Sequence, residues 1–180
     1  MENKLNVALI YGSARPGRFC DKVAAWVAAQ IQKGGEFVLS VIDPADSSSL
    51  NSLQQTIADA DAFVVVTPEY NHGYTAPLKS LIDSVGAEWQ AKPVAFVSYG
   101  GASGGLRAVE QLRQVFAELH AVTVRDAVSF ASAWEQFDGA GALREPARAE
   151  RSMATMLTRL RWWALALRHA RQETPYLQRA

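Results

Sequence analysis

Two short polar segments carry the residue types best suited to chemistry, and each one directly follows an apolar run. The first segment, Gly-Ser-Ala-Arg-Pro-Gly-Arg at residues 12–18, follows the run Val7–Tyr11 and precedes a predicted helix. Backbone N–H groups and the helix dipole favour an anion at such a helix start. Ser13 offers a hydroxyl, while Arg15 and Arg18 each offer the paired donors that suit a phosphate. These residues predict a phosphate-binding loop; the alternative is an ordinary turn with solvated arginines.

The residues of the first segment depart from two known phosphate-binding motifs. Gly12 and Gly17 have the spacing of a P-loop, but Arg18 and Phe19 stand where that motif needs lysine and a hydroxyl residue. Ala14 occupies the second glycine position of the dinucleotide fingerprint. The loop therefore favours the phosphate of a mononucleotide.

Two further segments follow apolar runs and could hold the rest of such a ligand. Residues 67–74, Thr-Pro-Glu-Tyr-Asn-His-Gly-Tyr, offer an amide for hydrogen bonds and aromatic rings for stacking. Residues 98–105, Ser-Tyr-Gly-Gly-Ala-Ser-Gly-Gly, contain four glycines that permit close approach of a flat ring to the backbone. His72 has no predicted chemical role beyond that of a solvated loop residue.

Strands alternating with helices must position these loops. Hydrophobic patterning predicts strands at Asn6–Tyr11, Phe37–Ile42, Ala62–Thr67, Pro93–Ser98 and Val122–Val128. It predicts helices at Phe19–Lys33, Ser48–Ala60 (capped by one of three serines), Thr75–Val85, Gly104–Leu119 and from Pro146 to about His169. Residues 131–144 are expected to be a loop.

This alternation predicts an α/β fold, a three-layer sandwich with helices on both faces of a five-stranded parallel sheet. Right-handed crossovers favour the flavodoxin-like strand order 2-1-3-4-5. In that order a ligand lies beyond the carboxyl ends of the first, third and fourth strands. The three polar loops follow those strands, so we expect them at one edge of the sheet.

Composition narrows the class of protein. The chain has 180 residues, 49% of them hydrophobic, and its formal net charge is zero, so one domain over residues 1–180 is expected and nucleic acid is not an expected partner. A single cysteine excludes an intrachain disulfide and a cysteine metal cluster, and we expect no metal site. Neither a membrane span nor a signal-peptide pattern is evident, so a cytoplasmic location is expected.

The chain resembles the NADPH-dependent FMN reductases, a flavodoxin-like family that includes quinone, chromate and azo-dye reductases. The resemblance covers roughly residues 5–130 and rests on three motifs: Gly12-Ser13-x-Arg15, Thr67–Asn71 with Gly73 and Ala76–Lys79, and Ser98–Gly101. It implies that hydride passes from NADPH or NADH through FMN to a small electron acceptor, such as a quinone, free flavin, azo compound or metal oxyanion. Because the cofactor carries this chemistry, no catalytic side chain is expected.

The resemblance also assigns residues to parts of the cofactor and implies a homodimer or homotetramer. It places Ser13, Arg15, Arg18, Phe19 and Cys20 around the FMN phosphate. It places Pro68, Glu69, Tyr70 and Asn71 beside the ribityl chain and isoalloxazine, and Ser98, Tyr99, Gly100 and Gly101 near the far side of the ring. A redox-regulatory flavoprotein with slow turnover, and a nucleotide-binding module without turnover, remain alternatives on the same fold.

The C-terminal region 146–180 is predicted to be an arginine-rich amphipathic helix with a tail. Residues 136–180 hold 8 Arg and 4 Asp or Glu, whereas residues 1–135 hold 10 Lys or Arg and 14 Asp or Glu. The helix carries an apolar stripe that includes Met153, Leu157 and Leu160. Three interpretations are open: a helix that covers its own sheet, one shared with a partner subunit, or one that lies on a membrane surface.

Overall fold

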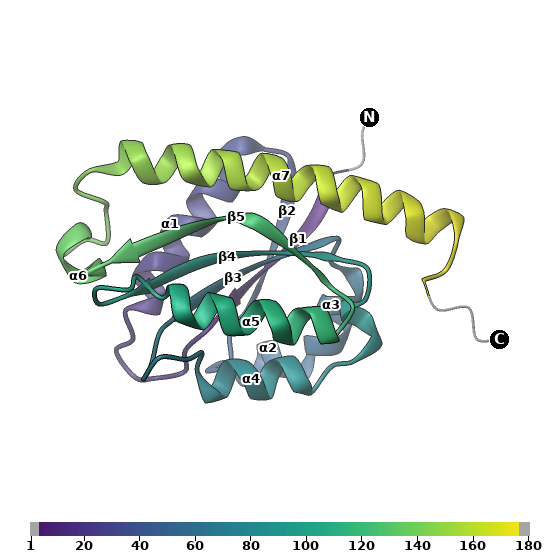
Figure 1. The fold of residues 1–180 in the computed structure, drawn as a ribbon, viewed down its shortest axis with the longest axis horizontal. Helices are drawn as coiled ribbons and strands as arrows, with labels where there is room; N and C mark the ends of the chain where they lie inside the picture. Colours follow the sequence, from purple (N-terminus) through teal and green to yellow (C-terminus); the bar gives the residue numbers. More distant parts are fainter. Residues whose placement is uncertain (1–3, 177–180) are drawn as a thin grey trace.

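A five-stranded parallel sheet forms the centre of the protein (Figure 1). The computed structural model describes residues 4–176. The strands are β1 (Leu5–Tyr11), β2 (Phe37–Ile42), β3 (Ala62–Pro68), β4 (Pro93–Gly100) and β5 (Val122–Ala131). Their spatial order is β2-β1-β3-β4-β5, and every neighbouring pair is parallel. The predicted order and sheet type are confirmed.

Helices cover both faces of this sheet, as predicted. One face packs against α1 (Cys20–Gly34) and α7 (Pro146–Glu173), and the other packs against α3 (Leu53–Asp59), α4 (Ala76–Asp83) and α5 (Leu106–Glu118). A one-turn 3-10 helix, η1 (Ala87–Trp89), precedes β4. Figure 1 shows α7 above the sheet and α4 and α5 below it.

The central strands are buried on both faces, which explains their continuous apolar sequences. Every residue of β3 is buried. Val64 and Val66 pack on the side of α1 and α7, while Phe63 and Val65 pack on the opposite side. Because the strands are parallel and fully covered, their carboxyl ends form the accessible edge at which loops can hold a ligand.

Two predicted elements were wrong in detail. The single helix expected at residues 48–60 is two helices, α2 (Ser47–Asn51) and α3, which meet at Ser52. The cap of α2 is not one of the serines: the Asp46 carboxylate accepts a hydrogen bond of 3.0 Å from the Ser48 backbone N–H. A carboxylate is at least as good an N-cap acceptor as serine, and its charge complements the helix dipole.

The region from β5 onward also differs from the prediction. Strand β5 continues to Ala131, and a short helix, α6 (Ala133–Gln136), lies where residues 131–144 were expected to be only a loop. The final helix ends at Glu173, four residues beyond the expected His169. Residues 177–180 of the predicted tail lie outside the described residues.

Helix α7 covers the sheet of its own chain, so the first of the three interpretations is confirmed. Met153, Met156 and Leu160 are fully buried on the β5 side of the sheet. Its C-terminal half is tied by charge to the body of the protein, because Arg168 Nη1 lies 3.4 Å from the Asp61 carboxylate. Within residues 4–176, no helix is both long and apolar enough to cross a membrane.

Candidate functional site

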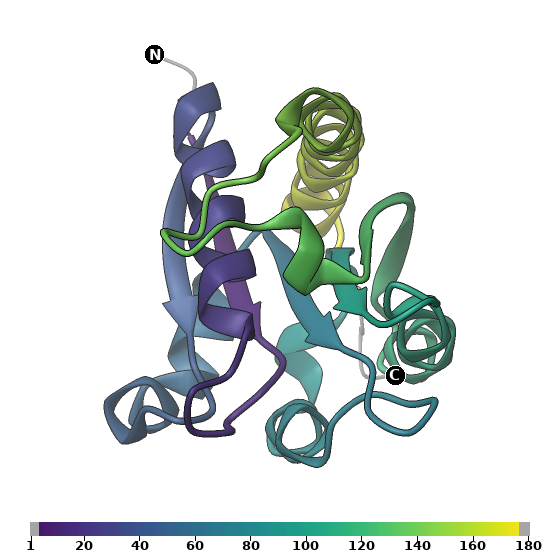
Figure 2. The ribbon, with the colours of Figure 1, turned by 90° about the vertical axis from the view of Figure 1, so that its left-hand side faces the viewer.

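Three polar loops meet at the carboxyl edge of the sheet, as their positions in the sequence predicted. They follow β1, β3 and β4, which are adjacent strands. Near their carboxyl ends, Tyr11 of β1 pairs with Val66 of β3, and Thr67 of β3 pairs with Ser98 of β4. Figure 2 looks onto this edge, where the β1 loop and the loops after β3 and β4 lie around the strand ends. We call them the first loop (residues 12–19), the second loop (69–75) and the third loop (101–105).

Close packing fixes the start of the first loop. The Gly12 N–H donates to Val66 O over 2.7 Å, and the Thr75 hydroxyl donates to Gly12 O. A Cβ at Gly12 would lie only 2.5 Å from Val66 O. Only glycine fits at this position, because any side chain would push β1 away from β3.

The first loop presents backbone donors with no protein acceptor. Among the described residues, the N–H groups of Ser13, Ala14 and Phe19 make no hydrogen bond to protein. Phe19 directly precedes α1, and Ser13 and Ala14 lie earlier in the same loop; the first turn of this 15-residue helix adds further unpaired N–H groups. Unpaired donors at the positive end of a helix form a cradle that fits a phosphate.

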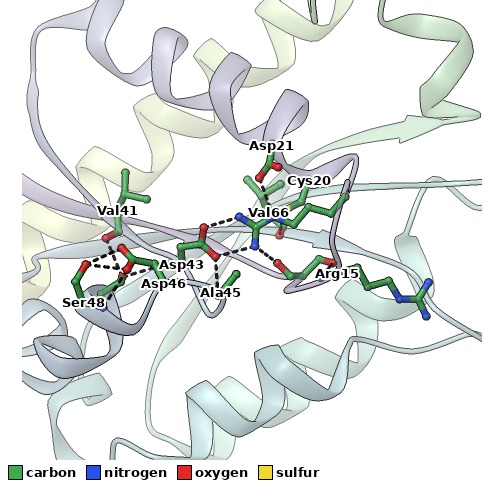
Figure 3. Close-up of polar contacts among 12 residues, drawn as sticks. Arg15, Cys20, Asp21, Val41, Asp43, Ala45, Asp46, Ser48 and Val66 are labelled. Atoms are coloured by element: carbon green, nitrogen blue, oxygen red, sulfur yellow. Dashed lines mark hydrogen bonds and ion pairs between the residues drawn. The ribbon is translucent and has the colours of Figure 1, made fainter.

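Arg15 and Tyr70 connect the first loop to the second. The Arg15 guanidinium carbon lies 3.8 Å from the centre of the Tyr70 ring, in a cation–π arrangement. The Tyr70 hydroxyl and Ser13 Oγ are 3.0 Å apart and share a hydrogen bond. Arg15 is exposed and extends away from the neighbouring acidic residues (Figure 3). Its charged end is therefore available at the mouth of the cradle.

Arg18 has a different role from Arg15. Its guanidinium is bound by two carboxylates, with Nη1 2.7 Å from Asp43 Oδ1 and Nε 2.7 Å from Asp21 Oδ1, and it also donates to Ser13 O. The side chain is only 8% exposed. Hydrogen bonding to Asp43 raises the pKa of Arg18, although burial opposes this shift. Burial by itself raises the pKa of Asp43, but hydrogen bonds from Arg18 and the Ala45 N–H outweigh that effect and lower it.

Arg18 thus stabilises the first loop from within the protein, because its guanidinium already donates to Asp43, Asp21 and Ser13 O. The Arg18 guanidinium binds Asp43 and Asp21 and does not face the open side of the cradle; Figure 3 labels both of these carboxylates. Asp43, at the end of β2, was not among the predicted site residues. Its acidic side chain after a strand at the same edge was the signal that could have identified it.

Cys20 lies in the core rather than in the cradle. Its side chain is fully buried, and Sγ lies 3.9 Å from Val66 O. Burial raises the pKa of the Cys20 thiol to about 11, so the thiol is neutral at physiological pH. Only the backbone of Cys20, at the first turn of α1, faces the first loop.

Aromatic packing lies beneath the loops. The Phe19 ring is half-buried and lies 5.9 Å from the Tyr99 ring and 5.6 Å from the Phe137 ring. Burial raises the pKa of Tyr99, whose hydroxyl has no hydrogen-bond partner among the described residues. Phe19 and Tyr99 therefore form the floor under the first loop and the end of β4.

The second loop is a tight reversal with exposed backbone. Tyr70 and Gly73 exchange two hydrogen bonds, of 3.0 and 3.1 Å. The two residues between them, Asn71 and His72, have positive φ angles of 51° and 71° and exposed side chains. Pro68, the last residue of β3, is buried beneath this turn. Asn71 is therefore presented at the tip of the turn.

Glu69 joins the second loop to the third instead of facing solvent. Its carboxylate is 5% exposed and accepts hydrogen bonds from the Ser103 hydroxyl (2.8 Å) and from the backbone N–H and Nε of Arg107. Burial alone raises the pKa of Glu69, but these hydrogen bonds outweigh it and the pKa is lowered. Ser103 and Arg107 were missing from the predicted residues, because nothing in their local sequence indicates this contact.

The third loop is anchored by Ser98 and left open at two glycines. The Ser98 side chain is fully buried and donates to Gly104 O over 2.8 Å. Gly105 has a φ of 85°, and a Cβ there would lie 2.8 Å from Ser98 Cβ. Gly100 is half-buried and Gly101 is exposed, so their backbone groups border the site.

The predicted residues therefore fall into two groups. Those at least partly exposed are Arg15, Phe19, Tyr70, Asn71, Gly100 and Gly101, whereas Ser13 is fully buried and its hydroxyl is hydrogen-bonded to that of Tyr70. Those whose side chains are used inside the protein, or buried beneath the loops, are Arg18, Cys20, Pro68, Glu69, Ser98 and Tyr99. Among the described residues, no cluster of three or more His, Cys, Asp or Glu side chains could hold a metal ion.

Most of the chain is similar to proteins of a known family. Residues 5–135 match the model of the family described as NADPH-dependent FMN reductase. A quinone reductase of Pseudomonas putida is 30% identical over 168 residues, which cover 82% of this chain and 89% of that protein. An NAD(P)H-dependent FMN reductase of Schizosaccharomyces pombe is 33% identical over 129 residues, which cover 61% of this chain.

The match spans 64% of the length of the S. pombe protein. Among solved structures, the flavoenzyme NAD(P)H:(acceptor) oxidoreductase FerB from Paracoccus denitrificans superposes with a TM-score of 0.70 at 21% identity, covering 88% of this chain and 97% of that one. A flavodoxin-like, WrbA-like protein from Agrobacterium tumefaciens superposes with a TM-score of 0.57 at 17% identity, covering 94% and 99%. At these identities the structural likeness shows the flavodoxin-like fold alone.

Proposed function

The chain belongs to the NADPH-dependent FMN reductase family, and we propose that it binds FMN at the carboxyl edge of its sheet. We propose further that it passes hydride from NADPH or NADH through FMN to a small electron acceptor. The observation that carries this proposal is that unpaired backbone donors before α1 lie at the same edge of the sheet as the exposed turn at Asn71 and the partly exposed Gly100 and Gly101.

In this proposal the first loop holds the phosphate. The free N–H groups of Ser13, Ala14 and Phe19, together with the start of α1, supply donors that need no rearrangement. Ser13 Oγ and the Arg15 guanidinium add a hydroxyl and a mobile positive charge. Arg18 positions the loop through Asp43 and does not itself need to reach the phosphate.

The second and third loops hold the ring. Tyr70 and the positive-φ backbone at Asn71 border one side, and Gly100 and Gly101 border the other. Glu69 fixes the spacing between these loops by binding Ser103 and Arg107. Backbone N–H groups at this edge would hydrogen-bond the polar rim of the ring and favour negative charge there.

FMN supplies the hydride and electron transfer when it is bound, and the protein supplies position and electrostatics. The residues at this site fit that division of labour. Cys20 is a neutral buried thiol, and the buried carboxylate Glu69 is held ionised by its partners. Neither is placed to exchange a proton with a ligand, so acceptors such as quinones, free flavin, azo compounds or metal oxyanions would take hydride or electrons at the ring and the accompanying protons from solvent.

We propose that residues 1–180 form one domain, which works as a homodimer or homotetramer in the cytoplasm. A subunit interface is supported by Trp162 and Trp163 on the outer side of α7, which are 61% and 36% exposed. Exposed paired tryptophans are common at protein interfaces. Light scattering of the purified protein should give a multiple of the 19.6 kDa chain mass, and a mass of one chain would refute the oligomer.

The cofactor assignment is tested by titrating FMN into the purified protein and following the quenching of FMN fluorescence. Saturable binding, followed by oxidation of NADPH or NADH when a quinone is added, is the expected result. Binding without turnover would favour the redox-regulatory alternative. Absence of FMN binding would favour the nucleotide-binding module without turnover.

A further inference from the structure

The residues that flank the short helix α6 contact both the first and the third loop, at the edge of the candidate site. Phe137, directly after α6, is buried and packs its ring edge-on against Phe19 at 5.6 Å and against Phe130 at 5.1 Å. The Ser132 N–H, directly before α6, donates to Gly101 O over 2.9 Å. Both ends of α6 are therefore attached to elements of the site.

The backbone before α6 is held in an unusual conformation. Ser132 has φ 46° and ψ 51°, the left-handed region that residues with a side chain rarely adopt. The Gln136 side chain donates to Ala131 O and so links the end of α6 to the end of β5. This conformation turns the chain at the end of β5, so that Ala133 faces the core and Trp134 faces out.

Trp134 lies beside the open glycines of the third loop. A Cβ at Gly101 would lie 3.8 Å from Trp134 Cη2, which is ordinary van der Waals contact. The indole is nonetheless 59% exposed. Trp134 thus places a large, exposed aromatic side chain against the backbone that would border the flavin.

We propose that Trp134 is a specificity-determining residue, whose indole forms an aromatic wall for a planar, electron-poor ring that binds over the flavin site. This inference rests on the proposed function, since it assumes FMN at the sheet edge. The indole is electron-rich and offers a face and an edge for stacking. The electron-poor ring is either the oxidised nicotinamide of NADP+, which remains after the donor has given up its hydride, or the quinone of the acceptor.

The experiment uses oxidised, FMN-loaded protein without reductant, so that binding is measured in the absence of turnover. Equilibrium dialysis gives the dissociation constants of 1,4-naphthoquinone and of NADP+ for the wild type, Trp134→Ala and Trp134→Phe. Tyr176→Ala is the matched control, because Tyr176 is also an exposed aromatic residue, at 51%, but it packs against His120 before the start of β5, at the opposite edge of the sheet. FMN affinity is measured separately for each protein by fluorescence quenching.

Trp134→Ala should weaken binding of at least one probe by roughly 5- to 10-fold, the loss expected for one aromatic stacking partner. Trp134→Phe should recover most of that loss, and Tyr176→Ala should equal the wild type. A loss confined to naphthoquinone identifies the acceptor, and a loss confined to NADP+ identifies the nicotinamide. A loss for both identifies a wall that the two rings share.

Unchanged binding of both probes to Trp134→Ala, with FMN affinity intact, would overturn the inference and leave the proposed function standing. A proportional loss of FMN affinity in Trp134→Ala would also overturn it, because the indole would then support the cofactor rather than a second ring. A wild type that binds no FMN would overturn the proposed function, and the role of Trp134 with it.

Discussion

Replacing Arg15 with alanine should weaken FMN binding without destabilising the protein. The Arg15 side chain is exposed, and its guanidinium lies over the Tyr70 ring at 3.8 Å from the ring centre. A charge-assisted hydrogen bond to phosphate is worth about 1.5–3 kcal/mol. Leaving the exposed Tyr70 face costs about 0.5–1 kcal/mol of cation–π attraction. The net loss of about 0.5–2.5 kcal/mol corresponds to an FMN affinity roughly 2- to 70-fold weaker.

The assay compares FMN with riboflavin, which lacks the phosphate. Fluorescence quenching should show that Arg15→Ala weakens FMN binding and leaves riboflavin binding nearly unchanged. Arg125→Ala is the control, because the Arg125 side chain is 95% exposed on β5. An FMN affinity equal to that of the wild type would refute the placement of Arg15 at the phosphate. Equal weakening of riboflavin would show that Arg15 acts on the ring through Tyr70 instead.

Three other substitutions test the supporting contacts. Asp43→Asn removes a charged partner of Arg18, whose side chain is only 8% exposed. This substitution should lower the free energy of unfolding, measured in urea, by about 2 kcal/mol. An unchanged free energy of unfolding would show that the pair does not support the loop. Glu69→Gln should destabilise the protein at neutral pH. The folded pKa of Glu69 lies below its ordinary value of 4.5, so this difference from wild type should persist above pH 4.5 and shrink as the pH falls through the folded pKa. A pH-independent difference would contradict this account. Leu160→Ala should cost about 2–4 kcal/mol, because Leu160 is fully buried between α7 and the sheet; a loss below about 1 kcal/mol would contradict that packing.

The packing of α7 also changes how an oligomer should be tested. Deletion of residues 146–180 would release a folded monomer only if the helix belonged mainly to an interface. Met153, Met156 and Leu160 instead complete the core of their own chain. Substitution of the exposed Trp162 and Trp163 leaves that core intact, so it is the cleaner way to separate subunits.

The fold was predictable from the sequence because burial leaves a strong pattern. Runs such as Phe63–Thr67 are apolar at every position, since both faces of β3 are covered. Turn residues then bounded each element to within a few positions. The breaks at Ser52 and around α6 were missed, because short helices depend on caps and on packing such as that of Phe137 rather than on periodicity.

The candidate site was predictable at the level of loops but not of side chains. Sequence placed three polar loops together, because their strands are neighbours in the 2-1-3-4-5 order. It could not tell Arg15 from Arg18, since the difference lies in Asp43, 25 residues away along the chain. It could not tell that Cys20 turns inward at the start of α1. Tertiary contacts decide which way a loop side chain points, and local sequence does not encode them.

The most direct test of the central claim is an anaerobic absorbance titration. The purified protein, supplied with FMN if it is colourless, is separated from free flavin and then treated with NADPH. The account predicts bound flavin bands that bleach on reduction and return when a quinone is added. A protein that retains no flavin even after incubation with excess FMN would contradict it.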